Sequence, residues 1–66
     1  METKTIELTV EEASMIAELI LIADGEGIGP DRYEVKPIQE KLNNVFGKEN
    51  IIKLLPSHRR NWEVFQ

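Results

Sequence analysis

The sequence predicts a small α+β fold, in which a two-stranded antiparallel sheet packs on two or three helices. Three observations lead to this prediction. Both ends of the chain alternate polar and apolar residues with the period of two that is typical of strands. A capping signal opens an apolar helix directly after the first of these ends. A second helical stripe follows in the middle of the chain, and 66 residues suffice for one domain, residues 1–66.

The predicted sheet joins the N-terminal and C-terminal segments. Residues 3–8 (TKTIEL) contain β-branched residues and place Ile6 and Leu8 on the side of the core. Residues 62–65 (WEVF) alternate in the same way. Because an isolated strand leaves its backbone groups unpaired, we expect the two segments to pair with each other. Trp62 is then a core anchor, since little other aromatic material is present to fill a small interior.

The first helix is predicted to begin after Thr9. The Thr9 hydroxyl caps the helix, and Glu12 reaches back to the Thr9 amide, so the two residues form a capping box. Gly25 is the expected end of this helix, because glycine accepts a positive φ without a Cβ clash. One stripe of the helix faces the core; it comprises Val10, Ala13, Ile16, Ala17, Ile20 and Ala23.

The same helix carries a second apolar stripe, formed by Met15, Leu19 and Ile22 at the spacing i, i+4, i+7. One possibility is that the strands and residues 51–55 wrap around the helix and cover this stripe. The other is that a second copy of the chain or a partner protein covers it. One short sheet and two helices can hardly surround a helix completely, so we predict Met15, Leu19 and Ile22 as a partner interface.

The second helix has two possible starts. Pro37 suits the first helical position, and proline biases the preceding residue toward extended geometry, so we favour a start at Pro37. Alternatively, Asp31 and Glu34 form a capping box that would begin the helix six residues earlier and leave Pro37 as an interior kink. Gly47 is the expected end.

The predicted core face of the second helix is a single stripe, which comprises Ile38, Leu42, Val45 and Phe46. Residues 48–55 contain four further isoleucines and leucines. We expect them to form one or two helical turns that pack on the core and end before Pro56; a short strand is the weaker alternative.

Charge is distributed unevenly along the chain, whose formal net charge is −4. Residues 1–33 carry two basic and eight acidic side chains, whereas residues 34–66 carry six basic and four acidic ones. We expect the two halves to pack on each other, with steering of a charged partner as the alternative. The negative net charge argues against indiscriminate adhesion to nucleic acids or anionic lipids.

Location is indicated only by what the sequence lacks. The chain contains no cysteine, which fits a reducing compartment, and its first residues lack the pattern of a signal peptide. The longest apolar run, residues 19–23, is far shorter than the roughly 20 residues of a membrane helix. We therefore expect a soluble, cytoplasmic protein without membrane contact.

Residues 24–29 (DGEGIG) suggest a phosphate or calcium loop, but neither pattern fits. The glycines follow a helix and alternate with acids that would repel phosphate. If Gly27 takes position 6 of an EF-hand loop, positions 1 and 12 fall on Ile22 and Tyr33, which are not calcium ligands. His58 has no second histidine or cysteine nearby, so we expect no metal and no cofactor.

No catalytic arrangement is evident either. Ser14 lies in the middle of the first helix, and the sequence neighbours Ser57 and His58 do not make a triad. Glu11 and Glu18 share a helical edge, but their surroundings indicate a solvated stripe rather than an acid–base pair. We predict that the protein is not an enzyme and has no small-molecule substrate.

The only basic and aromatic cluster consists of His58, Arg59 and Arg60, with Trp62 two residues later. Such a combination can hold phosphates and stack a base. Three charges on one turn are few for this task, so a solvated turn is the favoured interpretation, and His58, Arg59 and Arg60 are kept as a possible nucleic-acid contact.

Residues 6–13 (IELTVEEA) resemble the opening of many small bacterial and phage proteins, which implies a way of folding and no function. The sequence as a whole predicts a non-enzymatic protein-interaction module that forms a homodimer or binds a larger protein. One alternative is a small nucleic-acid-binding protein that uses the basic turn. The other is an acidic inhibitor that occupies a basic groove; it would use Glu11, Glu18, Asp24 and Glu26.

Overall fold

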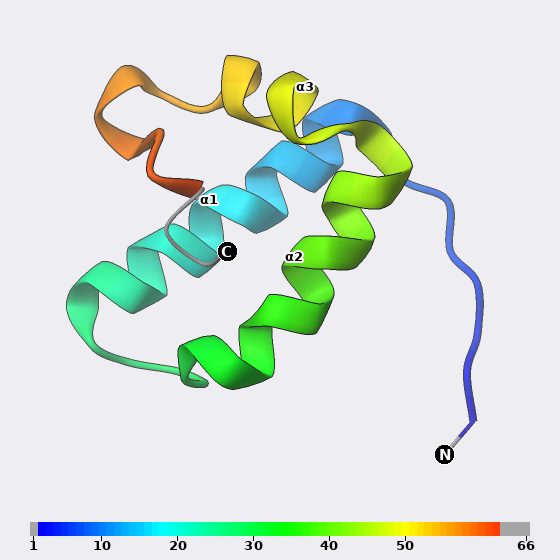
Figure 1. Ribbon diagram of the computed structural model, residues 1–66, viewed down its shortest axis with the longest axis horizontal. Helices are drawn as coiled ribbons and strands as arrows, with labels where there is room; N and C mark the ends of the chain where they lie inside the picture. The colour runs from blue at the N-terminus through cyan, green and yellow to red at the C-terminus, as the bar shows by residue number, and fades with distance from the viewer. Residues whose placement is uncertain (1, 63–66) are drawn as a thin grey trace.

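The computed structural model describes residues 2–62, which form three helices that pack against one another (Figure 1). The elements are α1 (Val10–Glu26), α2 (Arg32–Phe46), α3 (Lys48–Leu54) and a short 3-10 turn, η1 (Ser57–Arg59). α1 and α2 form a helical hairpin, and α3 packs against both of them. The fold class of the described part is therefore all-α.

The predicted α+β class is wrong, because none of residues 2–62 forms a strand. Residues 2–8, the N-terminal arm, run past α2 without regular secondary structure (Figure 1), and Ile6 is 74% exposed. Trp62 lies among the helices instead of beside the arm, and residues 63–65 of the predicted second strand lie outside the described residues. Alternation over six residues makes a strand only when a neighbour pairs with it, and no described segment does so.

α1 begins as predicted and ends two residues later than predicted. Thr9 and Glu12 form both bonds of the capping box, at 2.8 Å and 3.1 Å. Gly25 remains helical, and Gly27 adopts the left-handed conformation at φ 71°. The amides of Gly27 and Ile28 donate to the carbonyls of Asp24 and Ala23, the Schellman pattern. When the helix ends at Gly27, apolar Ile28 occupies the next position, where the Schellman motif favours an apolar residue. An ending at Gly25 would place Glu26 there instead.

α2 begins at the earlier of its two possible starts, so the favoured start at Pro37 is wrong. Asp31 caps the helix and forms a capping box with Glu34. Pro37 lies inside the helix, where it lacks an amide hydrogen. The turn before Pro37 is held by contacts with α1, because Arg32 binds Asp24 and Val35 is buried. These contacts offset the loss of one helical hydrogen bond.

The earlier start changes which residues of α2 face the core. Val35, Gln39 and Leu42 are buried, at the spacing i, i+4, i+7. The predicted stripe lies at the edge of this face: Leu42 is buried as expected and Phe46 is partly buried, but Ile38 and Val45 are exposed. Gly47 ends the helix with φ 88°, as predicted.

The helical turns predicted over residues 48–55 are confirmed by α3, which places Ile51 in the core. Leu55 has extended geometry ahead of Pro56, which explains where this helix stops. On the α1 side of the contact, Ser14 is buried, and its hydroxyl donates to the Ile51 carbonyl at 3.4 Å.

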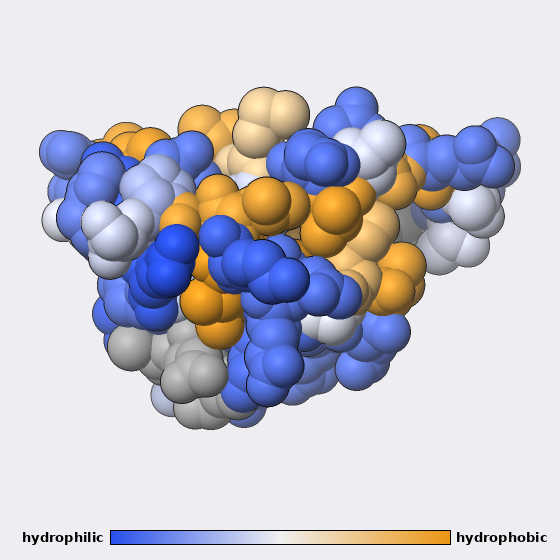
Figure 2. Space-filling model, turned by 90° about the horizontal axis from the view of Figure 1, so that it is seen from above, coloured by the Kyte–Doolittle hydropathy of each residue, from blue (hydrophilic) through white to orange (hydrophobic). Residues whose placement is uncertain are grey.

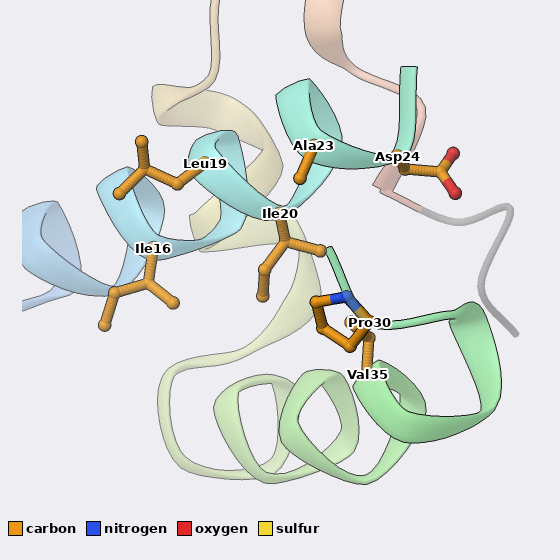
Figure 3. Close-up of a pocket in the computed structure, with 7 residues that line it drawn as sticks. All are labelled: Ile16, Leu19, Ile20, Ala23, Asp24, Pro30 and Val35. Atoms are coloured by element: carbon orange, nitrogen blue, oxygen red, sulfur yellow. The ribbon is translucent and has the colours of Figure 1, made fainter. Parts of the chain in front are cut away.

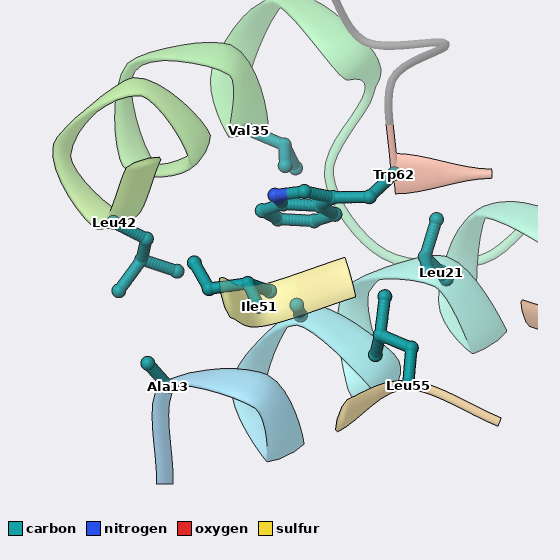
Figure 4. Packing of buried hydrophobic residues seen from close by; sticks show 8 residues of the cluster. Ala13, Leu21, Val35, Leu42, Ile51, Leu55 and Trp62 are labelled. Atoms are coloured by element: carbon teal, nitrogen blue, oxygen red, sulfur yellow. The ribbon is translucent and has the colours of Figure 1, made fainter. Parts of the chain in front are cut away.

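The prediction that Trp62 anchors the core is confirmed, since it is 0% exposed. Figure 4 shows its indole between side chains from all three helices. The indole Nε1 donates to Asn43 Oδ1 at 2.8 Å, and the Gln39 amide donates to the Trp62 carbonyl. The buried hydrophobic cluster comprises Ala13, Ala17, Leu21, Val35, Leu42, Ile51, Leu55 and Trp62.

Candidate interaction surface

The surface of α1 that points away from the core is apolar in the middle of the helix. Met15 is 57% exposed and Leu19 is 65% exposed, and Ile22 is partly buried. We call these three residues the α1 outer face. Residues 13–23 carry a single charge, that of Glu18. A soluble helix usually exposes polar side chains on this side, so α1 leaves an unusual surface in contact with water.

An apolar groove adjoins the α1 outer face, between α1 and the start of α2. Figure 3 shows Ile20 of α1 beside Pro30 and Val35, with Ile16 one turn earlier on the same side of the helix. The groove has a volume of about 200 Å³. Its lining comprises Ile16, Leu19, Ile20, Ala23, Asp24, Pro30 and Val35, and we call it the α1–α2 groove. Leu19 belongs to both features, so the outer face and the groove form one continuous apolar surface.

The acidic residues beside this surface are paired within the chain. Asp24 receives two hydrogen bonds from Arg32, both at 2.9 Å, and these bonds hold the pKa of the Asp24 carboxyl below its ordinary value. Glu18 Oε2 lies 3.8 Å from Arg59 Nε. The central part of α1 therefore presents no charge that lacks a counter-charge. Glu11 and Glu26, near the two ends of the helix, are exposed.

Sequence reasoning identified the α1 outer face but missed the groove beside it. It assigned Ile16, Ile20 and Ala23 to the core stripe, whereas all three are only partly buried. Leu21, which belonged to neither predicted stripe, is 4% exposed. The apolar character of α1 on nearly every side was the available signal, but Pro30 and Val35 reach the groove only because α2 starts early.

A second apolar region lies where the N-terminal arm passes α2. Val45 is 75% exposed, and its neighbours Leu42 and Phe46 line a shallow depression of about 650 Å³ with residues 4–8. Leu54 of α3 is also largely exposed. Figure 2 shows that hydrophobic atoms on the face above α3 form a broken band with hydrophilic side chains on both sides. Apolar exposure is thus widespread over residues 2–62, and the α1 surface is the one where an exposed helical stripe adjoins the groove lined by Ile16, Ile20 and Val35.

The basic turn predicted as a possible nucleic-acid contact lies in η1 and directly after it. His58 is exposed. Arg59 lies against Glu18, as described above, and Arg60 donates to the carbonyls of Leu55 and Lys53 at 3.1 Å and 3.5 Å. Both arginines therefore take part in holding the segment after α3 against the helices.

Of the residues weighed for catalysis, Glu11, Ser14 and Glu18 line one small pocket beside α3, whereas Ser57 and His58 do not line it. The Ser14 hydroxyl is buried against α3, while Ser57 and His58 are exposed on η1. Residues 2–62 contain no cluster of three or more histidine, aspartate or glutamate side chains arranged to hold a metal ion. No helix in this range has both the length and the apolar composition needed to pass through a bilayer.

Comparison of the chain with protein-family models, with curated proteins and with solved structures found no match in any of the three.

Proposed function

We propose that the protein is a non-enzymatic protein-interaction module that forms a homodimer through the α1 outer face. The observation that carries this proposal is the exposure of Met15 and Leu19 in the middle of a helix whose central segment has one charge. Burying an exposed leucine or methionine side chain contributes about 1.5–3 kcal/mol. Contact with a second copy of the chain would bury these side chains without any other ligand or partner.

Size supports the same proposal. A chain of 66 residues has little interior, and it contains no cysteine that would stabilise it through a disulfide. Oligomerisation is the remaining common means by which small domains gain stability. The absence of cysteine also supports a reducing compartment, and we place the protein in the cytoplasm on this ground.

Sedimentation equilibrium at tens of micromolar tests the proposal. We expect the wild-type chain to have the mass of a dimer, and Leu19→Glu to have the mass of a monomer, because a carboxylate buried without a partner costs several kcal/mol. Val45→Glu is the matched control, since it adds the same charge at a similarly exposed site on α2. A monomeric wild type, or equal effects of the two substitutions, would contradict the proposal.

Salt dependence separates the homodimer from the two alternatives. The ends of α1 are acidic, so added salt should leave self-association unchanged or strengthen it. Binding to a nucleic acid through Arg59 and Arg60 must weaken steeply as salt is added. Binding of the acidic residues to a basic groove must weaken as well.

A further inference from the structure

We infer that the α1–α2 groove binds a basic segment of another protein through one large apolar side chain of that segment. The groove has a volume of about 200 Å³, and its apolar lining includes Ile20, Ala23 and Val35. An apolar cavity of about 150 Å³ holds a benzene molecule, so the groove has room for one phenylalanine or leucine side chain. The inference goes beyond the proposed homodimer and does not require it, because the groove shares only Leu19 with the α1 outer face.

One end of the groove lies at an acidic part of the chain. The groove runs along α1 from Ile16 to Asp24 and reaches the loop between α1 and α2 at Pro30 (Figure 3). Residues 24–34 form this end of the helical hairpin, which we call the hairpin end, and they carry four acidic side chains and one basic one. The acidic residues are Asp24, Glu26, Asp31 and Glu34, and the basic residue is Arg32. A segment that fills the groove therefore meets an excess of negative charge there.

The dipole of α1 adds to this negative charge. α1 ends at Glu26, and its last turn contains no basic residue. The carbonyl groups at a helix C-terminus carry partial negative charge, so cations stabilise this end and anions destabilise it. Asp24 is paired with Arg32, but Glu26 is exposed on the same turn. A lysine or arginine of the partner supplies a cation at this helix end.

Two large apolar side chains are also exposed at the hairpin end. Tyr33 is 89% exposed, and Ile28 is 63% exposed. Tyrosine is enriched in contacts between proteins, and its ring attracts the guanidinium group of arginine. The hairpin end thus combines apolar contact area with negative charge, and this combination favours a basic partner over an acidic one.

A second copy of the chain suits the hairpin end less well than another protein does. The hairpin end of the second copy is equally acidic, and the basic excess of the chain lies in residues 34–66. Contact between the two regions would join different surfaces of the two copies. Such contacts build rings or filaments instead of a closed two-fold dimer.

Model peptides with a fluorescent label test the inference by fluorescence anisotropy. The probe is a helical peptide of about 14 residues, which has a phenylalanine between two leucines on one face and lysines on the other. A second peptide has glutamate in place of every lysine, and a third has serine in place of phenylalanine. We expect the lysine peptide to bind with a micromolar Kd and the other two to bind at least about tenfold more weakly.

Variants of the protein locate the site. Ala23→Trp fills the groove and should weaken binding of the lysine peptide about tenfold, whereas Val45→Trp adds the same indole at an exposed site on α2 and should leave binding unchanged. Glu26→Lys should weaken binding about two- to fivefold, and Glu40→Lys, the same charge change at an exposed site on α2, should weaken it less. Circular dichroism shows whether each variant keeps the melting transition of the wild type.

Equal binding of the lysine and glutamate peptides, or of the phenylalanine and serine peptides, would overturn the inference. A folded Ala23→Trp chain that binds the lysine peptide as tightly as the wild type would overturn it too. If that chain were also monomeric where the wild type is dimeric, the groove would belong to the homodimer contact. A dimeric wild type that binds no peptide overturns this inference alone, whereas a monomeric wild type that binds the lysine peptide overturns only the homodimer.

Discussion

α1 and α2 have similar lengths and similar end signals, yet the middle of α1 presents far fewer charges to solvent than α2 does. Each begins with a capping box and ends at a glycine with positive φ. The outward side of α2 mixes charged with apolar side chains: Lys36, Glu40, Lys41, Ile38 and Val45 are all exposed. The middle of α1 exposes Met15 and Leu19, and Glu18 carries its only charge. The end signals fix where each helix starts and stops. The side chains on its outward side determine whether that surface suits contact with water or with another protein.

The inward sides of the two helices differ in the size of the residues they bury. α1 buries the small residues Ala13, Ser14 and Ala17 against its neighbours, whereas α2 buries Val35 and Leu42. Small inward residues let α3 approach α1 closely, as the bond between the Ser14 hydroxyl and the Ile51 carbonyl shows. Several of the large apolar residues of α1 are therefore left on its outside. This arrangement forgoes burial of apolar surface in a monomer, and the proposed homodimer would recover it.

The largest expected effect comes from Trp62, which both helices share as a packing partner. Trp62→Ala should abolish cooperative folding, because truncating a buried tryptophan costs about 3–5 kcal/mol and a domain this small has only about 5 kcal/mol of stability. Thermal denaturation followed by circular dichroism checks this result. His58→Ala, an exposed substitution nearby, is the control. A Trp62→Ala chain that melts within a few degrees of the wild type would show that the indole is dispensable.

A comparison within α1 separates its inner and outer faces. Leu21→Ala should destabilise the chain by about 2–5 kcal/mol at every protein concentration, because Leu21 is buried. Leu19→Ala should instead remove the dependence of the melting temperature on protein concentration, because it weakens only association. The measurement is the melting temperature over a hundredfold range of concentration. Equal losses for both variants in dilute solution would place Leu19 in the core of the monomer.

The smallest expected effect concerns the ion pair that joins the two helices. The hydrogen bonds from Arg32 lower the pKa of Asp24 in the folded chain, so the pair stabilises folding above the ordinary carboxyl pKa. This contribution is lost as the pH falls below about 4 and through the lowered pKa. Asp24→Asn should therefore unfold at lower urea than the wild type at pH 7. The two midpoints should converge as the pH falls through the lowered pKa of Asp24, and a gap that persists once this carboxyl is protonated would contradict this account.

Local sequence signals correctly predict the features whose interacting residues lie within a few positions of one another. Thr9 and Glu12 close their capping box within one turn. Gly47 ends α2 because glycine accepts a positive φ, and Pro56 ends α3 because it keeps the preceding Leu55 in extended geometry. Composition predicts Trp62 as a core residue, because little other aromatic material is present to fill the interior, and its side chain is buried. Each of these features depends on local geometry or on composition alone.

Tertiary structure decided the features that need a distant partner. Residues 3–8 have a strand pattern, but a strand forms only where another segment pairs with it. Pro37 lies inside α2 because the turn before it is held against α1 through Arg32 and Val35. The local preference of proline gives no information about these long-range contacts. The inward side of α1 was likewise set by where α2 and α3 pack, since a helix that is apolar nearly all round does not specify which side to bury.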